Sequence, residues 1–529
     1  MDQSDDMGPT DSGVNPKVKM SPAETSQQPV FDFLARPATF GGASVKRIDT
    51  HAATVFLAGD HAFKIKRAVR FPFLDYSTLE KRQAACAAEI EVNRAYAPAI
   101  YRRVVAITRD KDGTLAIGGQ GEPVEWAVEM RRFDETQTLD HLADAQRIDG
   151  VLADALGRTV ARAHAAARTN KAAGFVDELA EVIAQNDEEL RAAPDLFPTA
   201  DVAALTQATR TVFERVRSLL QARERAGLVR RCHGDLHLGN IVLLDGAPVL
   251  FDAIEFDPRI ATGDVLYDLA FLLMDLIERG LKAAANVVLN RYLGATRRNE
   301  DLDALAALPL FLSLRAAIRA KVTAKRRAQG AESAHIAQSA RAYFALAGRL
   351  LAPPPPRLVA VGGLSGTGKS LLARALAAQI LPEPGAVVLR SDVERKALFG
   401  LAETDRLPEA GYAPDVTAKI YAILADKARR AVAAGHSAIV DAVFAHAAER
   451  AAIAQAAAAA TFYGLFLSAD LSVRLARVGA RAGDASDADA AVARRQEQYD
   501  LGTMDWTTAD ASDSPEETLR RAKTALGIG

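Results

Sequence analysis

The chain has 529 residues, 49% of them hydrophobic, and its 65 basic residues nearly balance 67 acidic ones. This length is too great for one hydrophobic core and predicts two or three domains, while the balanced charge argues against a basic surface for nucleic acid. The two cysteines, Cys86 and Cys232, are far apart in the sequence and fit a reducing compartment better than a disulfide framework. The N-terminus is acidic and polar, unlike a secretory signal, and no stretch is apolar enough to cross a bilayer. We therefore expect a cytoplasmic protein with no membrane partner.

Composition divides the chain into four parts. Residues 1–29 are rich in Asp, Ser, Pro, Gly and Gln and are predicted to be a disordered tail. Four consecutive prolines in residues 351–356 cannot continue a helix or enter a sheet interior, so we expect an extended linker there. Residues 30–350 combine early strand-like runs with long helical patterns, and residues 357–529 alternate strand and helix. Each of these two segments is predicted to be a domain.

The first chemical candidates are two lysines in "ATVFLAGDHAFKIKRAV", which reads as two strands joined by a short turn. Alternation places Lys64 and Lys66 on one face, opposite Phe63 and Ile65. They are either solvated charges on an edge strand or cations held for a phosphate ligand. A helical segment follows with two acids, Glu89 and Glu91, and then comes the apolar strand "VEWAVEMRRF".

The stretch "RRCHGDLHLGNIVLLDG" places polar groups between two apolar runs that read as short strands. Asn240 follows Asp235 by five residues, and the next strand, "APVLFDAIEFD", carries Asp252 at its end. In protein-kinase-like phosphotransferases a loop after a strand carries a catalytic acid, with an asparagine five residues later and a further acid one hairpin later that bind Mg²⁺. An aspartate that acts as the catalytic base needs no histidine beside it, so we expect His233 to brace the loop.

These motifs closely resemble the aminoglycoside phosphotransferase family, whose members also phosphorylate choline, homoserine and related metabolites. The resemblance implies a protein-kinase-like bilobal fold with Asp235 as the base and with Asn240 and Asp252 as Mg²⁺ ligands. It further implies that Lys64 or Lys66 meets the ATP phosphates with Glu89 or Glu91 as its acidic partner. Backbone groups near Met130 and Arg131 would read adenine. One departure is the absence of a G-x-G-x-x-G loop before the lysine strand.

Residues after the metal acid are expected to support this loop. In "TGDVLYDLAFLLMDL", Asp264 reads as a helix N-cap, and Asp268 resembles the acid that braces the catalytic loop in this family. Farther along, Arg315 and Arg319 fall on the apolar face of a helical pattern. Two alternatives remain open for these arginines, structural pairing or the lining of a pocket for an anionic acceptor.

The second predicted domain opens on a strand, a glycine-rich loop and a helical pattern, the order that a phosphate-binding loop requires. The loop reads Gly363, Leu364, Ser365, Gly366, Thr367, Gly368, Lys369, Ser370. Its backbone N–H groups can turn toward phosphates, Lys369 can reach the outer phosphates, and Ser370 can ligate Mg²⁺.

Two further strand-like runs of this domain end in acids, Asp392 and Asp441. In open α/β sheets the ligand lies beyond the carboxyl ends of the strands, so both acids should face the phosphate loop. We expect Asp441 to support Mg²⁺ and Asp392 to orient or deprotonate an acceptor hydroxyl, unless either acid only caps the next helix. Arg477 and Arg481 lie in a segment that reads either as a mobile lid, whose cations neutralise the transferring phosphoryl group, or as a solvated helix face.

Residues 357–529 resemble the small P-loop kinase family described as AAA-type predicted kinases, similar in plan to gluconate, shikimate and nucleotide kinases. In that family the "SD" after the second strand, the "DA" strand end and lid arginines recur, and here they match Asp392, Asp441, Arg477 and Arg481. Together the two resemblances imply an ATP- and Mg²⁺-dependent phosphotransferase with two sites. Its implied partner is a small hydroxyl acceptor, which is anionic in the first domain if Arg315 and Arg319 line its pocket. A rival hypothesis makes one or both domains nucleotide-binding switches.

Overall fold

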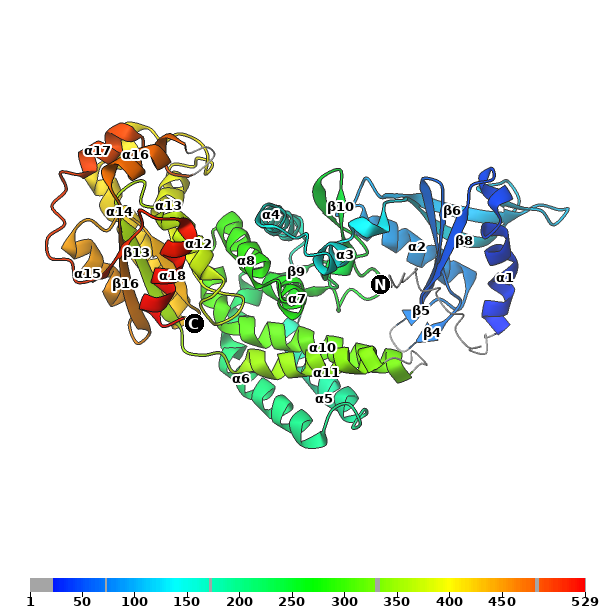
Figure 1. The fold of residues 1–529 in the computed structure, drawn as a ribbon. Helices are drawn as coiled ribbons and strands as arrows, with labels where there is room; N and C mark the ends of the chain where they lie inside the picture. The colour runs from blue at the N-terminus through cyan, green and yellow to red at the C-terminus, as the bar shows by residue number, and fades with distance from the viewer. Residues whose placement is uncertain (1–21, 72–73, 171–173, 329–333, 481–484, 529) are drawn as a thin grey trace, which may run out of the picture. The chain divides into compact units, whose positions relative to one another are not determined.

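A computed structural model describes residues 22–528 except 72–73, 171–173, 329–333 and 481–484. The chain forms two compact units (Figure 1). The first contains Met1–Phe133, Glu255–Asp257 and Arg319–Arg341, and the second contains Asp134–Ile254, Pro258–Ile318 and Ala342–Gly529. None of the described helices combines the length and the apolar character needed to span a membrane.

The first unit is built on a six-stranded antiparallel sheet of order β1-β2-β3-β8-β6-β7. Its strands are β1 (Val45–Asp49), β2 (Ala53–Ala58), β3 (His61–Lys66), β6 (Tyr101–Arg109), β7 (Leu115–Ile117) and β8 (Glu122–Arg131). Helix α1 (Pro22–Leu34) packs on one face, where Phe31 and Leu34 join Phe63 and Ile65 in a buried core. Helix α2 (Leu79–Asn93) covers the other face, which carries the lysines (Figure 1). The predicted hairpin and its alternation are confirmed.

Helix α1 corrects the expected extent of the tail. Residues 22–29 lie in this helix instead of a disordered segment, and residues 1–21 lie outside the described part of the chain. Gln27 is 2% exposed and its amide nitrogen donates to the Lys66 carbonyl and to Glu125, while its oxygen accepts from the Ala68 N–H. Local composition predicted disorder here because it cannot register these contacts, which join residues about 40 or more positions apart in the sequence.

The second unit begins with a largely helical part. It contains α3 (Leu139–Asp144), α4 (Gly150–Ala166), α5 (Phe175–Arg191), α6 (Thr199–Arg225), α7 (Val265–Glu278), α8 (Lys282–Thr296) and α9 (Asn299–Asp303). Two short antiparallel pairs join β9 (Val229–Arg231) to β12 (Thr262–Asp264) and β10 (Ile241–Leu244) to β11 (Ala247–Leu250). Helices α10 (Leu308–Ala328) and α11 (Ala334–Leu351) follow in the sequence, and their stretch Arg319–Arg341 belongs to the first unit. Residues 353–356 form neither helix nor strand.

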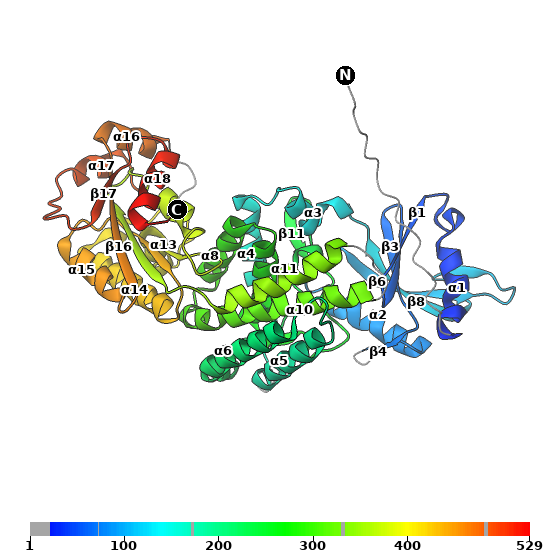
Figure 2. The same cartoon turned by 60° about the horizontal axis from the view of Figure 1, so that its bottom comes forward.

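The C-terminal part of this unit is a five-stranded parallel sheet of order β14-β15-β13-β16-β17. The strands are β13 (Arg357–Gly363), β14 (Val387–Arg390), β15 (Ala438–Asp441), β16 (Thr461–Ser468) and β17 (Thr507–Asp510). Helices α12 (Lys369–Ala377) and α18 (Pro515–Leu526) cover one face and α14 (Pro414–Ala433) and α15 (Ala447–Ala456) the other (Figure 2). The predicted alternation of strand and helix is confirmed. Because the strand order reverses beside central β13, its carboxyl end is the expected ligand-binding edge.

Helix α8 packs against β14, the edge strand of this parallel sheet. The Asn290 Oδ1 accepts from the Val388 N–H at 2.7 Å, and its Nδ2 donates to the Ala386 carbonyl at 3.1 Å. These two backbone groups flank Val387 and are the pair that one residue of a neighbouring parallel strand would engage. The side chain of Asn290 therefore terminates the sheet in place of a further strand.

Candidate functional sites

The phosphate loop joins β13 to α12, as the sequence predicts. Gly363, Gly366 and Gly368 adopt positive φ values of 137°, 89° and 91°, which side chains disfavour. A Cβ at Gly366 would also lie 2.6 Å from the Arg474 carbonyl oxygen, so a residue with a side chain would not fit between the loop and the backbone of Arg474. The Lys369 ammonium donates to the Leu364 carbonyl at 3.1 Å and thus folds back over the loop.

A cluster of oxygen ligands lies beside this loop. Asp441 ends β15 and its Oδ2 accepts from the Ser370 hydroxyl at 2.6 Å and from the Arg390 Nε at 3.2 Å. Parallel pairing of β13 with β15 brings these groups together, because Asp441 lies opposite Val361 near the start of the loop. A serine hydroxyl and a carboxylate are hard oxygen ligands that suit Mg²⁺ bound to a nucleotide phosphate.

Asp392 lies in the first turn of α13 (Ser391–Leu398), directly after β14. The N-cap of this helix is Arg390, so Asp392 does not have the capping role that was the alternative. Burial raises the pKa of the Asp392 carboxyl, and the charge of Asp441 raises it further against the opposing charges of Arg390 and Lys369. As the sequence predicts, Asp392 and Asp441 lie at the same end of the sheet, and both line one cavity.

The arginines of the expected lid are held in different ways. Arg477, in α16 (Leu471–Gly479), donates from Nη1 to the Ala511 carbonyl at 2.7 Å and from Nη2 to the Asp513 carbonyl at 2.8 Å. Arg474 is 2% exposed and its Nε donates to the Ser365 carbonyl of the phosphate loop. Arg481 lies outside the described residues. Transition-state neutralisation by Arg477 or Arg481 thus stays a prediction.

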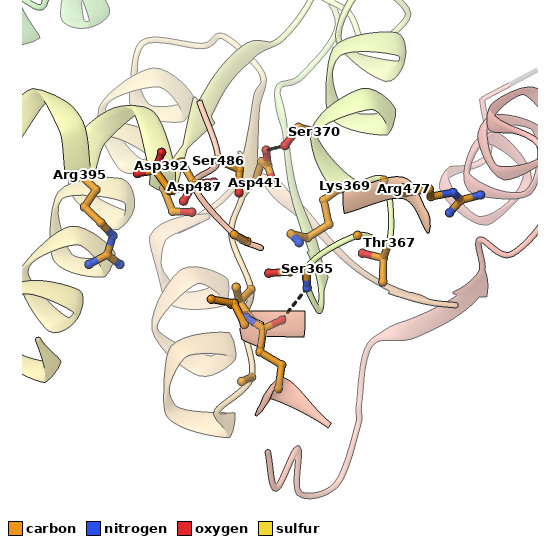
Figure 3. A pocket seen from close by; sticks show the side chains of 18 of the residues that line it. Ser365, Thr367, Lys369, Ser370, Asp392, Arg395, Asp441, Arg477, Ser486 and Asp487 are labelled. Atoms are coloured by element: carbon orange, nitrogen blue, oxygen red, sulfur yellow. Dashed lines mark hydrogen bonds between the residues drawn. The ribbon is translucent and has the colours of Figure 1, made fainter. Parts of the chain in front are cut away.

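A cavity of about 1580 Å³ unites these groups (Figure 3). Figure 3 shows Lys369 and Ser365 between Arg477 on one side and Asp392 with Ser486 and Asp487 on the other. Residues of α13, residues 406–413, α14 and residues 486–499 also line this cavity. Tyr412 and Asp487 meet there, since the tyrosine hydroxyl donates to the carboxylate at 3.0 Å. The cavity can hold a nucleotide and an acceptor side by side.

The second candidate site is the loop between β9 and β10. The Asn240 Nδ2 donates to the Asp235 Oδ2 and to the Asp235 carbonyl, both at 2.9 Å. The side chain of Asp235 is 40% exposed, with the His237 Nε2 at 3.4 Å from its carboxylate. Burial raises the pKa of Asp235, but the hydrogen bond and charge of His237 outweigh burial and hold it below its ordinary value. Asp235 is therefore ionised at neutral pH.

The β10–β11 hairpin brings Asp252 toward this pair. Ile241 lies opposite Leu250, and the Phe251 N–H donates to the Asn240 carbonyl at 2.9 Å. Asp252 is the next residue and adopts a positive φ of 59°, which is uncommon for a residue with a side chain. Asn240 and Asp252 thus lie at the same end of the hairpin and offer an amide oxygen and a carboxylate to one cation.

A buried chain of hydrogen bonds fixes the loop from behind. The Gly234 N–H donates to the Asp268 Oδ1 at 2.8 Å, and the Asp268 Oδ2 lies 3.0 Å from the His164 Nε2. The His164 Nδ1 is in turn 3.0 Å from the Tyr292 hydroxyl on α8. His233 is 1% exposed and its Nε2 lies 2.9 Å from the Phe251 carbonyl. The expected bracing roles of His233 and Asp268 are confirmed.

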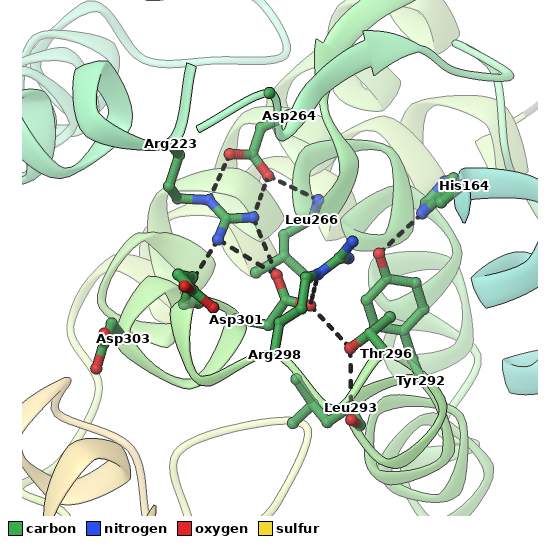
Figure 4. Close-up of polar contacts among 12 residues, drawn as sticks. His164, Arg223, Asp264, Leu266, Tyr292, Leu293, Thr296, Arg298, Asp301 and Asp303 are labelled. Carbon is green, nitrogen blue, oxygen red and sulfur yellow. Dashed lines mark hydrogen bonds and ion pairs between the residues drawn. The ribbon is translucent and has the colours of Figure 1, made fainter. Parts of the chain in front are cut away.

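Two further expectations concern charged residues near this loop. Asp264 caps α7 by accepting from the Leu266 N–H and also pairs with buried Arg223, which confirms its structural role (Figure 4). Arg315 is 5% exposed, donates to the Gly234 carbonyl at 3.4 Å, and lies 3.9 Å from the Tyr267 ring centroid. Structural pairing, one of the two alternatives, therefore accounts for Arg315.

The two lysines of β3 form a compact ionic cluster in the first unit. Glu89 is fully buried, with Oε1 at 2.9 Å from the Lys64 Nζ and Oε2 at 2.5 Å from the Lys66 Nζ. Lys66 also lies 2.5 Å from the Glu255 Oε1, and its side chain is 4% exposed against 15% for Lys64. Burial lowers the pKa of Lys66, but Glu89 and Glu255 outweigh burial and hold it above its ordinary value. Because β3 lies between β2 and β8, the edge-strand alternative is wrong.

The backbone groups expected to contact adenine lie at the end of β8. The Arg131 N–H donates to the Ile100 carbonyl at 2.7 Å, and the Arg132 N–H donates to the Asp60 carbonyl at 2.9 Å. Met130 lies within the sheet, opposite Ala62 on one side and Tyr101 on the other. The N–H groups of Arg131 and Arg132 are therefore engaged within the protein, and recognition of adenine by the other backbone groups near Met130 and Arg131 stays a prediction.

Comparison with known proteins agrees with this division of sites. Residues 49–308 match the family described as "Phosphotransferase enzyme family", and residues 358–500 match "AAA domain". Uncharacterized proteins of Mycobacterium tuberculosis and Mycobacterium bovis are 34% identical over 470 residues, which cover 86% of this chain and 90% of theirs. The chain belongs to the family of these mycobacterial proteins. It is a fused protein in which a kinase-like phosphotransferase domain precedes a P-loop kinase-like domain, as the sequence motifs imply.

Solved structures with partial similarity cover one domain each. A choline/ethanolamine kinase family protein from Mesorhizobium loti has a TM-score of 0.39 and 17% identity, covering 62% of this chain and 95% of its own. A gluconokinase from Sinorhizobium meliloti has a TM-score of 0.24 and 20% identity, covering 32% and 92%. The general activity, ATP-dependent phosphoryl transfer, is supported by the two family matches and not by these structures.

Sequence reasoning missed several residues at these sites. Glu255 meets Lys66 from 189 positions away, and Gln496 meets Ser365 of the phosphate loop from 131 positions away. His237 remained unassigned, although it caps the short 3₁₀ turn Leu238–Asn240 and lies beside Asp235. The spacing of His237 from Asp235 could have suggested the last contact. Nothing local in the sequence indicates the first two.

Proposed function

We propose that this protein is a bifunctional small-molecule kinase that transfers the γ-phosphoryl group of ATP to hydroxyl acceptors at two Mg²⁺-dependent sites. The observation that carries this proposal is the 2.9 Å pair of Asp235 and Asn240, an ionised acid fixed beside an amide at the end of the β10–β11 hairpin. A loop used only to bind a nucleotide would need no such acid. The P-loop domain has its own acid, lysine and hydroxyl around one cavity.

In the first predicted domain, residues 30–350, Asp235 is the proposed base. It accepts the proton of the acceptor hydroxyl, whose oxygen forms the new bond to the γ-phosphorus while the bond from that phosphorus to the β,γ-bridging oxygen breaks and ADP leaves. Asn240 and Asp252 are the proposed holders of Mg²⁺, which neutralises phosphate charge when bound. Lys64 is our choice for the phosphate lysine, because it is the more exposed partner of Glu89 and Lys66 is engaged by two carboxylates.

In the P-loop domain, Lys369 and the loop N–H groups are the proposed phosphate ligands, and Ser370 with Asp441 the proposed Mg²⁺ holders. Asp392 is the proposed group that orients or deprotonates the acceptor. Its raised pKa suits an acid that takes up a proton during transfer. The acceptor is a small molecule that fits the wall formed by α13, α14 and residues 486–499.

A metabolite screen with each domain silenced in turn tests the proposal. Lys369→Ala silences the P-loop site, and Asp252→Asn silences the first site. A kinase releases ADP only when a suitable hydroxyl acceptor is added, and the product carries the phosphoryl group. Slow hydrolysis that no acceptor accelerates in either variant would favour the rival hypothesis, a nucleotide-binding switch.

A further inference from the structure

Residue Ser365 of the phosphate loop is held on both sides of its backbone. Its N–H donates to the Gln496 Oε1 at 2.6 Å, and its carbonyl accepts from the Arg474 Nε at 2.9 Å. All three residues are buried, with exposed fractions of 8%, 6% and 2%. A backbone unit fixed at both its donor and its acceptor cannot rotate without breaking one of the two bonds. The orientation of this part of the loop is therefore set by α16 and α17.

The two helices that supply these contacts are joined to each other. Arg474 in α16 donates from Nη2 to the Ala493 carbonyl of α17 (Ala490–Gln496) and also pairs with Glu497. The close approach of the Arg474 carbonyl to Gly366 seats α16 directly on the loop. The clamp formed by Arg474 and Gln496 is thus continuous from α17 through α16 to the loop.

The carboxamide of Gln496 has a second end. A backbone N–H can only donate, so the Gln496 atom that faces the Ser365 N–H is the amide oxygen, Oε1. The amide nitrogen of Gln496, Nε2, is therefore the atom that does not contact Ser365. Gln496 lines the same cavity as Lys369, and its Nε2 has no hydrogen-bond partner among the described residues. The dashed line at Ser365 in Figure 3 marks the bond that fixes this orientation.

The position along the loop indicates what this amide can bind. The Lys369 ammonium contacts the Leu364 carbonyl, one residue before Ser365. A phosphate-loop lysine reaches the outer phosphates of the nucleotide, so the Gln496 amide lies at the same end of the loop. A fixed N–H donor aimed at phosphoryl oxygens binds them more strongly when their charge is greater.

We propose that Gln496 donates to the outer phosphoryl group of the bound nucleotide and so makes the P-loop site select a nucleoside triphosphate over a diphosphate. This inference rests on the proposed kinase function of that domain. Arg474 is a positioning residue in it, because it acts through Ser365 and α17 and not on the nucleotide.

Calorimetric titration of the full chain with ATP and with ADP in the presence of Mg²⁺ tests the inference. Asp252→Asn is included throughout to silence the first site, and Lys369→Ala in that background provides the blank. Gln496→Ala should weaken ATP binding about tenfold, the typical effect of losing one hydrogen bond to a charged group, and change ADP binding less than about twofold. Gln498→Ala is the matched control, because Gln498 is exposed and lies two residues beyond. This control should keep both affinities.

Gln496→Glu separates donation from structural support. A carboxylate still accepts from the Ser365 N–H but cannot donate to a phosphoryl oxygen, so the preference for ATP should fall as in Gln496→Ala. An unchanged ratio of ATP to ADP affinity in Gln496→Glu, or an equal loss of both affinities in Gln496→Ala, would overturn the inference. A signal that Lys369→Ala leaves intact would instead contradict the proposed function of the domain.

Discussion

The Ser370 hydroxyl donates to the Asp441 Oδ2 at 2.6 Å, across the gap between the helix after one strand and the end of the neighbouring strand. Two oxygen ligands separated by 71 positions are thereby held at one point beside the phosphate loop. We predict that Asp441→Asn, which keeps an oxygen acceptor but removes the charge, weakens nucleotide binding at this site about tenfold with Mg²⁺ and little when Mg²⁺ is chelated. Calorimetry with the first site silenced checks this. Equal losses with and without Mg²⁺ would remove Asp441 from the metal site.

The two lysines of β3 should behave differently when replaced. Lys64→Ala should weaken Mg·ATP binding in the first domain while the free energy of unfolding falls by less than about 1 kcal/mol, since Lys66 still pairs with Glu89. Lys66→Ala removes the cation that pairs with the buried Glu255, while Glu89 keeps Lys64, and should cost about 3 to 5 kcal/mol, the typical effect of breaking a buried ion pair. Urea unfolding and ATP titration of both variants, with the P-loop site silenced, measure the two effects. Equal stabilities would show that Lys66 is not a structural cation.

The contact of Asn290 with β14 predicts a defined stability loss. Asn290→Ala removes the acceptor of the Val388 N–H and one donor to the Ala386 carbonyl, so the free energy of unfolding should fall by about 1 to 3 kcal/mol. Urea unfolding of the full chain measures this loss. Asn299→Ala is the control, because the Asn299 side chain makes no hydrogen bond among the described residues. Equal free energies of unfolding in both variants would contradict a structural role for Asn290.

The two nucleotide sites should be separable. The phosphate loop and the Asp235 loop each have their own acid and metal ligands, so wild-type protein should bind two ATP molecules and Lys369→Ala one. Calorimetric stoichiometry gives the count directly. A single site in the wild-type protein that disappears in Lys369→Ala would leave only the P-loop domain as a kinase.

Local sequence pattern predicted much of this arrangement, because the relevant groups lie within single strand–loop units. The hairpin that carries Lys64 and the loop that carries Asp235 and Asn240 follow from alternation and spacing over a few residues. The same holds for the strand, loop and helix around Lys369.

Other features depend on contacts that local pattern does not encode. Gln27 and Asn290 have the composition of tail and surface residues, yet each satisfies backbone groups about 40 to 100 positions away. The engagement of the Arg131 N–H has the same origin, because its bond to the Ile100 carbonyl is decided by how the chain enters β6. Such tertiary hydrogen bonds fix which polar groups remain available for a ligand.

The rate of phosphoryl transfer by Asp235→Asn tests the central claim most directly. With an acceptor from the screen and the P-loop site silenced by Lys369→Ala, single-turnover transfer of the γ-phosphoryl group from ATP should slow by about 10² to 10⁴, the usual effect of removing a general base. ATP affinity should stay nearly unchanged, because asparagine keeps the size and polarity of the side chain that pairs with Asn240. A transfer rate equal to that of the parent protein would contradict the account and leave the Asp235 loop a structural element.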